Sequence, residues 1–294
     1  MIVPFAFISW WFIFVLLREM GRNQESKAGV FFMATLVMWA VSVLFEIGFN
    51  KRSELLPIIG GFLFYQSANW VIRNYLSRDP LFVNTCVSLL HSSITSATVV
   101  IIIINRWMTS STKDMFEHSQ LVETTWPGAY AALCISSGYF AYDQGDMLLY
   151  HLYSGPIPSI LSHHLILLIC FILALYRNVT INYLILTLIC ELHSVILHMR
   201  KVRRMTGVRD ARIKVVKIEW VVNLITFVLA RFSSHVLITV KLIRDASKFG
   251  KGVELPLALF GMAGMNLLNV FLGIDLFKAY QRERRTRNVS SKSS

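Results

Sequence analysis

Charged side chains are scarce in this sequence. Asp, Glu, Lys and Arg make up 16% of its 294 residues, whereas soluble globular proteins average about 25%. Hydrophobic residues make up 55% of the chain, and they gather in runs of about 20, the length that crosses a bilayer as a helix. The composition therefore excludes an ordinary soluble domain. We expect an all-α fold, a polytopic transmembrane helical bundle that fills almost the whole chain.

Paired cysteines and histidine-rich boxes are also lacking. The four cysteines lie in apolar runs without CxxC spacing, so no disulfide framework is predicted; they are Cys86, Cys134, Cys170 and Cys190. The HxxxH and HxxHH boxes of intramembrane hydroxylases and desaturases do not occur. One zinc ion held by a histidine pair and two acids is the remaining metal alternative. We predict no metal and no resident cofactor.

Nine segments are candidate spans, and the weaker ones leave the count between seven and nine. The first lacks the basic start and cleavage site of a signal peptide, and polar residues interrupt the third. The nine segments are residues 2–17, 30–49, 55–75, 81–104, 127–150, 157–176, 179–199, 219–242 and 255–278.

Basic residues account for the formal net charge of +12 and concentrate in two short segments. Residues 200–217 contain eight Lys or Arg and one acid, and residues 281–294 contain five more basic residues. A Lys and Arg excess beside spans marks the cytoplasmic side, so we predict that both segments are cytosolic. Such clusters meet anionic lipid headgroups more often than nucleic acid. Membrane lipids and acyl chains are therefore the expected partners, nucleic acid is not, and homo-oligomer formation stays open.

Several ionisable side chains lie inside the predicted spans, where each costs about 2.5–3.5 kcal/mol and usually lines a cavity or pairs with another. Asp143, the pair His163–His164 and Glu191 come from three successive helices. At 1.5 Å per residue all lie about 10–12 Å from the cytosolic edge. A histidine beside a carboxylate can act as a general acid–base or a nucleophile. We predict that these four residues are catalytic; a buried network that only ties helices together is the alternative.

Four further residues at membrane depth are predicted to contact substrate: Asp146, His193, Arg231 and His91. Asp146 lies one turn closer to water than Asp143 and suits a headgroup contact. Arg231 lies near mid-membrane and needs a carboxylate or phosphate partner, so structural pairing and lipid-phosphate binding are both open. His91 and His235 equally suit hydrogen bonds between helices.

Several of these residues recur in short motifs. Ser137-Gly138-Tyr139-Phe140 precedes Asp143, His163-His164 follows, and Glu191 begins the run ELHSVILHMRK. As a spaced set over about residues 81–280, they resemble the TLC domain. Ceramide synthases, translocon-associated membrane proteins and a neuronal ceroid lipofuscinosis protein share this domain. The resemblance implies a six-helix core over 81–280, N-terminal transmembrane helices over 1–80 and a basic cytosolic tail over 281–294.

The resemblance also carries functional expectations. In ceramide synthases the paired histidines and neighbouring acids are associated with acyl transfer from acyl-CoA to a sphingoid base, roles that fall by position on His163, His164 and Asp143. The synthases carry a second acid three residues after the first, but here Ser194 follows Glu191. At this point the chain is closer to the subgroup that regulates phospholipid composition and fluidity of the plasma membrane. That subgroup is understood to limit incorporation of polyunsaturated acyl chains.

Three readings follow from these residues and the resemblance. The first is a multi-pass plasma-membrane regulator of phospholipid acyl composition and membrane fluidity, with acyl transfer from acyl-CoA as one route. The second is a ceramide-synthase-like N-acyltransferase of the endoplasmic reticulum. The third is a non-catalytic lipid-binding or scaffold protein.

Overall fold

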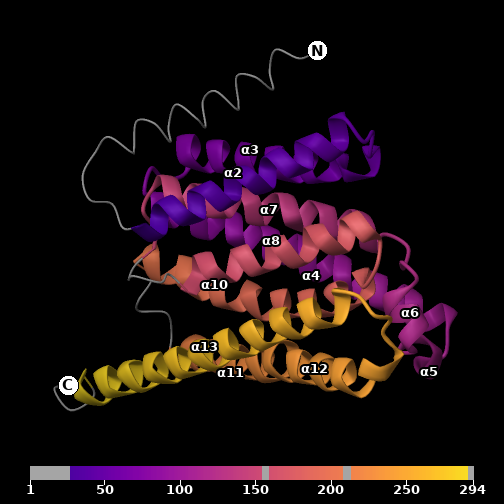
Figure 1. The fold of residues 1–294 in the computed structure, drawn as a ribbon. Helices are drawn as coiled ribbons and strands as arrows, with labels where there is room; N and C mark the ends of the chain where they lie inside the picture. Colours follow the sequence, from indigo (N-terminus) through magenta and orange to yellow (C-terminus); the bar gives the residue numbers. More distant parts are fainter. Residues whose placement is uncertain (1–26, 154–158, 208–212, 291–294) are drawn as a thin grey trace.

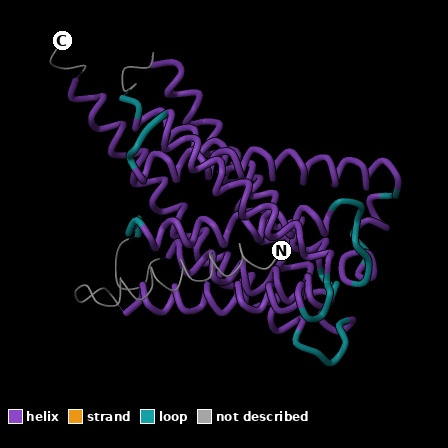
Figure 2. Tube along the Cα trace, turned by 90° about the horizontal axis from the view of Figure 1, so that it is seen from above, coloured by secondary structure: helices purple, strands orange, loops and turns teal. Residues whose placement is uncertain are grey.

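The computed structural model describes residues 27–153, 159–207 and 213–290. These residues form helices and connecting loops without any strand (Figure 2). The long helices lie side by side in one bundle, and α13 extends beyond it toward the C-terminus (Figure 1). The predicted all-α helical bundle is confirmed.

In the part of the chain that the structure describes, ten helices build the bundle and two short helices lie in one loop. In chain order the ten are α2 (Lys27–Gly48), α3 (Leu56–Tyr75), α4 (Pro80–Thr109), α7 (Ala129–Leu149), α8 (Ser159–Arg177), α9 (Ile181–Thr187), α10 (Glu191–Met205), α11 (Ile213–Thr226), α12 (Ser234–Arg244) and α13 (Glu254–Ser290). The loop between α4 and α7 holds α5 (Thr112–Met115) and α6 (His118–Val122).

Two of the predicted spans are not uniform α-helices. A 3₁₀ turn over Leu188–Cys190 joins α9 to α10, and a π-helical segment over Phe227–Ser233 joins α11 to α12. A 3₁₀ turn has 3.0 residues per turn instead of 3.6, and π-helical segments are wider and frequently lie at functional sites. Both irregularities change which side chains face the interior.

Seven helical stretches in the described part of the chain are long and apolar enough to cross a membrane. They coincide with seven of the nine predicted segments. They are Ala28–Gly48, Ser53–Tyr75, Pro80–Thr109, Ser159–Arg177, Ile181–Met205, Ile218–Arg244 and Glu254–Arg282. The predicted segment 127–150 is helix α7, which is too polar to belong to this set, and the predicted segment 2–17 lies outside the described residues.

Helix α7 is at the centre of the packing, in contact with α2, α3, α4 and α8. Its approach to α3 depends on two glycines, because small residues let membrane helices pack closely. A Cβ atom on Gly138 would lie 2.3 Å from the carbonyl oxygen of Ile58, and one on Gly61 would lie 2.6 Å from that of Ile135. No larger residue fits at this crossing without moving a helix.

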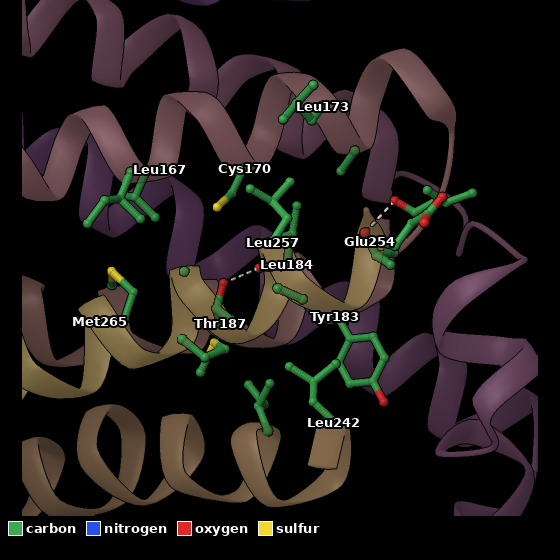
Figure 3. A pocket seen from close by; sticks show the side chains of 18 of the residues that line it. Leu167, Cys170, Leu173, Tyr183, Leu184, Thr187, Leu242, Glu254, Leu257 and Met265 are labelled. Atoms are coloured by element: carbon green, nitrogen blue, oxygen red, sulfur yellow. Dashed lines mark hydrogen bonds between the residues drawn. The ribbon is translucent and has the colours of Figure 1, made fainter. Parts of the chain in front are cut away.

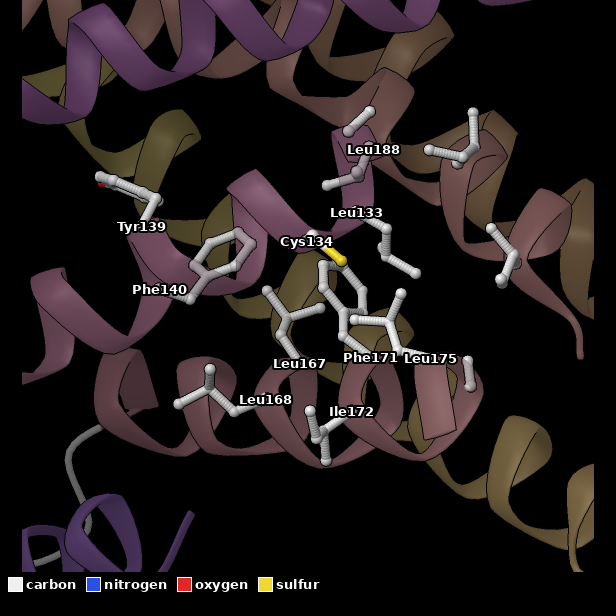
Figure 4. Packing of buried hydrophobic residues seen from close by; sticks show 14 of the residues in the cluster. Leu133, Cys134, Tyr139, Phe140, Leu167, Leu168, Phe171, Ile172, Leu175 and Leu188 are labelled. Carbon is white, nitrogen blue, oxygen red and sulfur yellow. The ribbon is translucent and has the colours of Figure 1, made fainter. Parts of the chain in front are cut away.

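The interior next to α7 combines an apolar layer with a polar one. Leu133 and Phe140 of α7 pack against Leu168 and Phe171 of α8 (Figure 4). The next turns of α7 carry buried polar residues that include Asp143 and Asp146. Large apolar side chains instead cover the outside of the bundle, for example Met38, Leu229 and Leu237. A polar interior inside an apolar exterior is the arrangement expected of a protein surrounded by lipid.

Candidate functional site

The two carboxylates of α7 are held by amide side chains from the neighbouring helices. Asn84 of α4 donates from Nδ2 to Asp143 Oδ1 at 2.7 Å and to Asp146 Oδ2 at 3.0 Å. Asn69 of α3 donates to Asp146 Oδ1 at 3.0 Å. Both carboxylates are buried. These bonds fix the direction of each carboxylate and leave Asp143 Oδ2 to face α8.

Asp146 also faces a cation. The guanidinium of Arg73 on α3 lies 3.9 Å from Asp146 Oδ1, donates from Nε to Asn69 Oδ1 at 3.2 Å and stacks 4.2 Å from the centre of the Tyr150 ring. Asp146 therefore joins α3 to α7 in the structure, and its predicted headgroup contact stays a prediction.

His164 is the histidine that meets a carboxylate. Its Nε2 atom lies 3.6 Å from Asp143 Oδ2, and its Nδ1 atom is buried without a hydrogen-bond partner. A distance of 3.6 Å is too long for a hydrogen bond, but catalytic contacts often tighten only when substrate binds. The pair thus has one ring nitrogen beside a carboxylate and the other free.

His163 turns away from this pair, as the rotation of about 100° between adjacent helical residues predicts. The two imidazole rings lie 5.4 Å apart between centroids. His163 is close enough to Arg231 and His235 for their charges to act on it.

Glu191 lies in a separate group of buried side chains. Its Oε2 atom accepts a hydrogen bond from Ser92 Oγ at 2.7 Å. Close by, His91 stacks on Tyr139 with ring centroids 3.6 Å apart and contacts the Tyr65 hydroxyl at 3.3 Å. The carboxylates of both Asp143 and Glu191 act electrostatically on Tyr139. The four residues predicted to be catalytic therefore divide: Asp143 and His164 meet directly, whereas His163 and Glu191 contact other neighbours.

A third polar group surrounds Arg231 in the π-helical segment. Arg231 is buried and donates from Nη2 to Ser194 Oγ at 2.5 Å. His193 approaches Thr226 Oγ1 with Nδ1 at 3.2 Å, and His235 approaches the Arg231 carbonyl oxygen with Nδ1 at 2.8 Å. The predicted substrate contacts Arg231 and His193 thus share one group, whereas His91 belongs with Glu191 and Asp146 with Arg73.

An apolar cavity of about 70 Å³ lies among α8, α9, α12 and α13. Leu167 and Met265 lie at one end and Glu254 at the other (Figure 3). Its lining follows α8 from Ile166 to Arg177, a distance of about 16 Å at 1.5 Å per residue. Ile166 is one turn after His163, and Arg177 pairs with Glu254 at 2.5 Å at the far end.

The resemblance implies a lipid-sized cavity inside the bundle, but the position of this cavity was not predicted. Its lining is mostly Leu, Ile, Met and Ala, which equally form lipid-facing surfaces in this chain. Neither Asp143 nor His164 lines it. Among the described residues, no three His, Cys, Asp or Glu side chains converge in a way that could hold a metal ion. The arrangement of the polar side chains suits proton transfer and lipid contact.

Comparison with known proteins places this geometry in a family. The TLC domain matches residues 81–278, a range that runs from the start of α4 into α13. A TLC domain-containing protein 2 from Danio rerio is 26% identical over 178 residues, covering 58% of this chain and 70% of that protein. A TLC domain-containing protein 2 from Homo sapiens is 26% identical over 222 residues, covering 74% and 78% respectively. No solved structure matches. The family resemblance drawn from the sequence motifs is confirmed.

Proposed function

The chain belongs to the TLC domain family, and we propose that it sets the acyl composition of plasma-membrane phospholipids, and with it membrane fluidity, by acyl transfer. Family membership and the two relatives support a role in membrane lipids. The observation that carries the chemical proposal is the buried Asp143–His164 pair with its free Nδ1 atom. In this proposal the transfer favours saturated and monounsaturated chains and thereby limits incorporation of polyunsaturated ones.

The pair supplies a base. When the contact tightens on substrate binding, Asp143 Oδ2 accepts a hydrogen bond from the N–H group at His164 Nε2. This keeps the lone pair on Nδ1 and stabilises the imidazolium once it forms. A lysophospholipid hydroxyl gives its proton to Nδ1 while its oxygen attacks the thioester carbonyl of acyl-CoA. The new C–O bond forms, the C–S bond breaks, and His164 returns the proton to the departing CoA thiolate. The products are a diacyl phospholipid and CoA.

We assign part of the acyl chain to the apolar cavity beside α8, because about 70 Å³ is too small for a whole fatty-acyl chain. The cavity begins at Ile166, one turn from His163, and apolar side chains such as Leu184 and Leu257 line it. Burying each CH₂ group of the chain there contributes about 0.8 kcal/mol relative to water. Rigid bends at several cis double bonds need a wider space than a straight chain, which gives a physical reason for selection against polyunsaturated chains.

The test uses the full-length protein in lipid nanodiscs with labelled acyl-CoA. Offered a lysophospholipid and sphinganine separately, the protein should acylate the lysophospholipid. His164→Ala and Asp143→Asn should each lower the rate about 10²- to 10⁴-fold, the usual contribution of general acid–base catalysis. His151→Ala, which removes an exposed histidine, is the matched control. Turnover that persists in His164→Ala contradicts the proposal, and ceramide formation instead supports the N-acyltransferase alternative.

A non-catalytic lipid-binding role is the second candidate, and one observation favours it. Asn84 and Asn69 already hold the α7 carboxylates, as in a polar network that only joins helices. In agreement, neither Asp143 nor His164 lines the cavity. Rescue of cells lacking the protein separates the two candidates. If His164→Ala restores the phospholipid acyl profile as well as the unchanged protein does, the role is binding; if it fails while folding normally, the role is catalytic.

A further inference from the structure

Arg231 carries a charge deep inside the bundle. It lies 13 residues from each end of the span Ile218–Arg244, which is about 20 Å from either end at 1.5 Å per residue. It is 8% exposed. Its guanidinium keeps its charge under all physiological conditions, and a charge at this depth pairs with another group or faces a polar cavity.

The chain itself leaves Arg231 incompletely paired. Its Nη2 atom bonds to Ser194 Oγ, a neutral group, and its Nε atom is buried without a hydrogen-bond partner. Among the described residues, no carboxylate forms an ion pair with it. A buried charged donor that lacks an acceptor loses more free energy than a neutral one. The guanidinium therefore has a donor left for an acceptor from outside the described residues.

The neighbouring histidines offer the opposite kind of atom. Thr226 donates its hydroxyl proton to the carbonyl oxygen of Val222 at 2.8 Å, so its oxygen accepts from His193 Nδ1. His235 Nδ1 donates to the carbonyl oxygen of Arg231. In a neutral imidazole the second nitrogen then carries a lone pair. His193 Nε2 and His235 Nε2 are both buried without partners, so each is an acceptor that lacks a donor.

We propose that this group, Arg231 with His193 and His235, binds the polar part of a lysophospholipid. The phosphate accepts from Arg231. Before acyl-CoA binds, the free glycerol hydroxyl donates to an imidazole Nε2, and it turns to His164 Nδ1 only for the transfer step. The charge of Arg231 reaches both histidines and His163, and the ring of His163 lies 5.4 Å from that of His164. The choice of a lysophospholipid rests on the proposed function; the need for an oxyanion and a hydroxyl rests on the unpartnered atoms.

The experiment measures lipid binding without acyl-CoA, by native mass spectrometry of detergent-solubilised protein. The probes are lysophosphatidic acid, phosphatidic acid, monoacylglycerol and oleate, which separate the phosphate, the hydroxyl and a carboxylate. Because Arg231 would donate a charge-assisted hydrogen bond, Arg231→Gln should weaken the binding of lysophosphatidic acid about tenfold to a hundredfold. The same substitution should leave the affinity for monoacylglycerol, which has no phosphate, nearly unchanged.

Ser194→Asp guards against misfolding of the arginine variant. It places a carboxylate on the residue that Arg231 already contacts, so it should pair the guanidinium internally and expel the lipid anion while the fold is kept. Arg244→Gln, at the exposed end of the same helix, is the matched control and should bind normally.

Each outcome decides one part of the proposal. Equal binding of lysophosphatidic acid and monoacylglycerol, or normal binding by Ser194→Asp, overturns the site. If oleate binds as tightly as lysophosphatidic acid, the site does not select a phosphate. If phosphatidic acid binds as tightly, the site does not recognise the free hydroxyl. Binding that survives while turnover is absent refutes only the acyl-transfer chemistry, and turnover that survives in Ser194→Asp refutes only this site.

Discussion

The contact between α3 and α7 predicts that Gly138→Ala destabilises the protein. The added Cβ atom would lie 2.3 Å from the Ile58 carbonyl oxygen and 2.6 Å from the Phe62 amide nitrogen. Both are backbone atoms, so no side chain can rotate out of the way. Because ordinary contact begins at 3.4 Å, α3 must move back by about 1 Å in a closely packed interior.

The magnitude follows from two opposing effects. Overpacking typically costs about 1–3 kcal/mol, and replacing glycine by alanine within a helix recovers about 1 kcal/mol. A retreat of α3 also stretches the bonds from Asn69 to Tyr142, now 2.6 Å, and to Asp146, now 3.0 Å. The bond to a charged group contributes about 1.5–3 kcal/mol, so we expect a net loss of about 1.5–5 kcal/mol.

The assay is the apparent thermal unfolding midpoint in detergent, followed by size-exclusion chromatography of heated samples. For a protein of this size each kcal/mol corresponds to about 2–4 °C, so Gly138→Ala should unfold several degrees earlier. Gly60→Ala is the control: its Cβ would meet nothing within 4 Å, so it should be neutral or slightly stabilising. Equal midpoints for the two variants would refute the close helix contact.

Three further predictions concern other parts of the molecule. Asn84→Ala removes the donor shared by both α7 carboxylates and should lower the unfolding midpoint by several degrees, at about 1.5–3 kcal/mol per lost charged hydrogen bond. Burial lowers the pKa of His118 below 6.5, and Asp245 at 3.7 Å offsets this only partly. Because the unfolded chain then binds the proton more readily, the free energy of unfolding falls as pH drops through 6.5. His118→Gln should reduce that loss of stability, measured as unfolding midpoints between pH 7.5 and 5.5. Burial raises the pKa of the Asp245 carboxyl, but lysine hydrogen bonds outweigh this and lower it from 3.8, so that group contributes no change in this window. Ala258→Phe should fill the cavity and reduce incorporation of labelled acyl chains, whereas Ala263→Phe, on the exposed side of the same helix, should not; equal incorporation by the two variants would remove the cavity from the mechanism.

The spans and the depth of the polar layer could be predicted from the sequence, because each depends only on position along the helix axis. Runs of about 20 apolar residues fix where a helix crosses, and the rise of 1.5 Å per residue fixes depth along it. This reasoning placed Asp143 and His164 at the same level, and the structure brings them to 3.6 Å. Their shared depth was sufficient because α7 and α8 are uninterrupted α-helices that contact each other.

The direction in which a side chain points could not be predicted where the helix geometry changes. The 3₁₀ turn Leu188–Cys190 directly precedes Glu191 and advances each residue by about 120° instead of 100°. Glu191 consequently contacts Ser92 and not the Asp143–His164 pair. The π-helical segment around Arg231 has the same effect on its neighbours. Neither segment contains a proline or glycine that would have signalled the irregularity.

The burial of α7 also constrains how the protein is assembled. A helix with two aspartates and too little apolar surface to be a span on its own enters the lipid poorly if it must do so alone. Among the side chains that contact its carboxylates, Asn69, Arg73 and Asn84 belong to helices made earlier in the chain, whereas His164 belongs to α8, which is made later. Synthesis from the N-terminus therefore delivers the first three partners before α7. Helix α7 can then leave the insertion machinery directly into contact with α3 and α4, which have already been made.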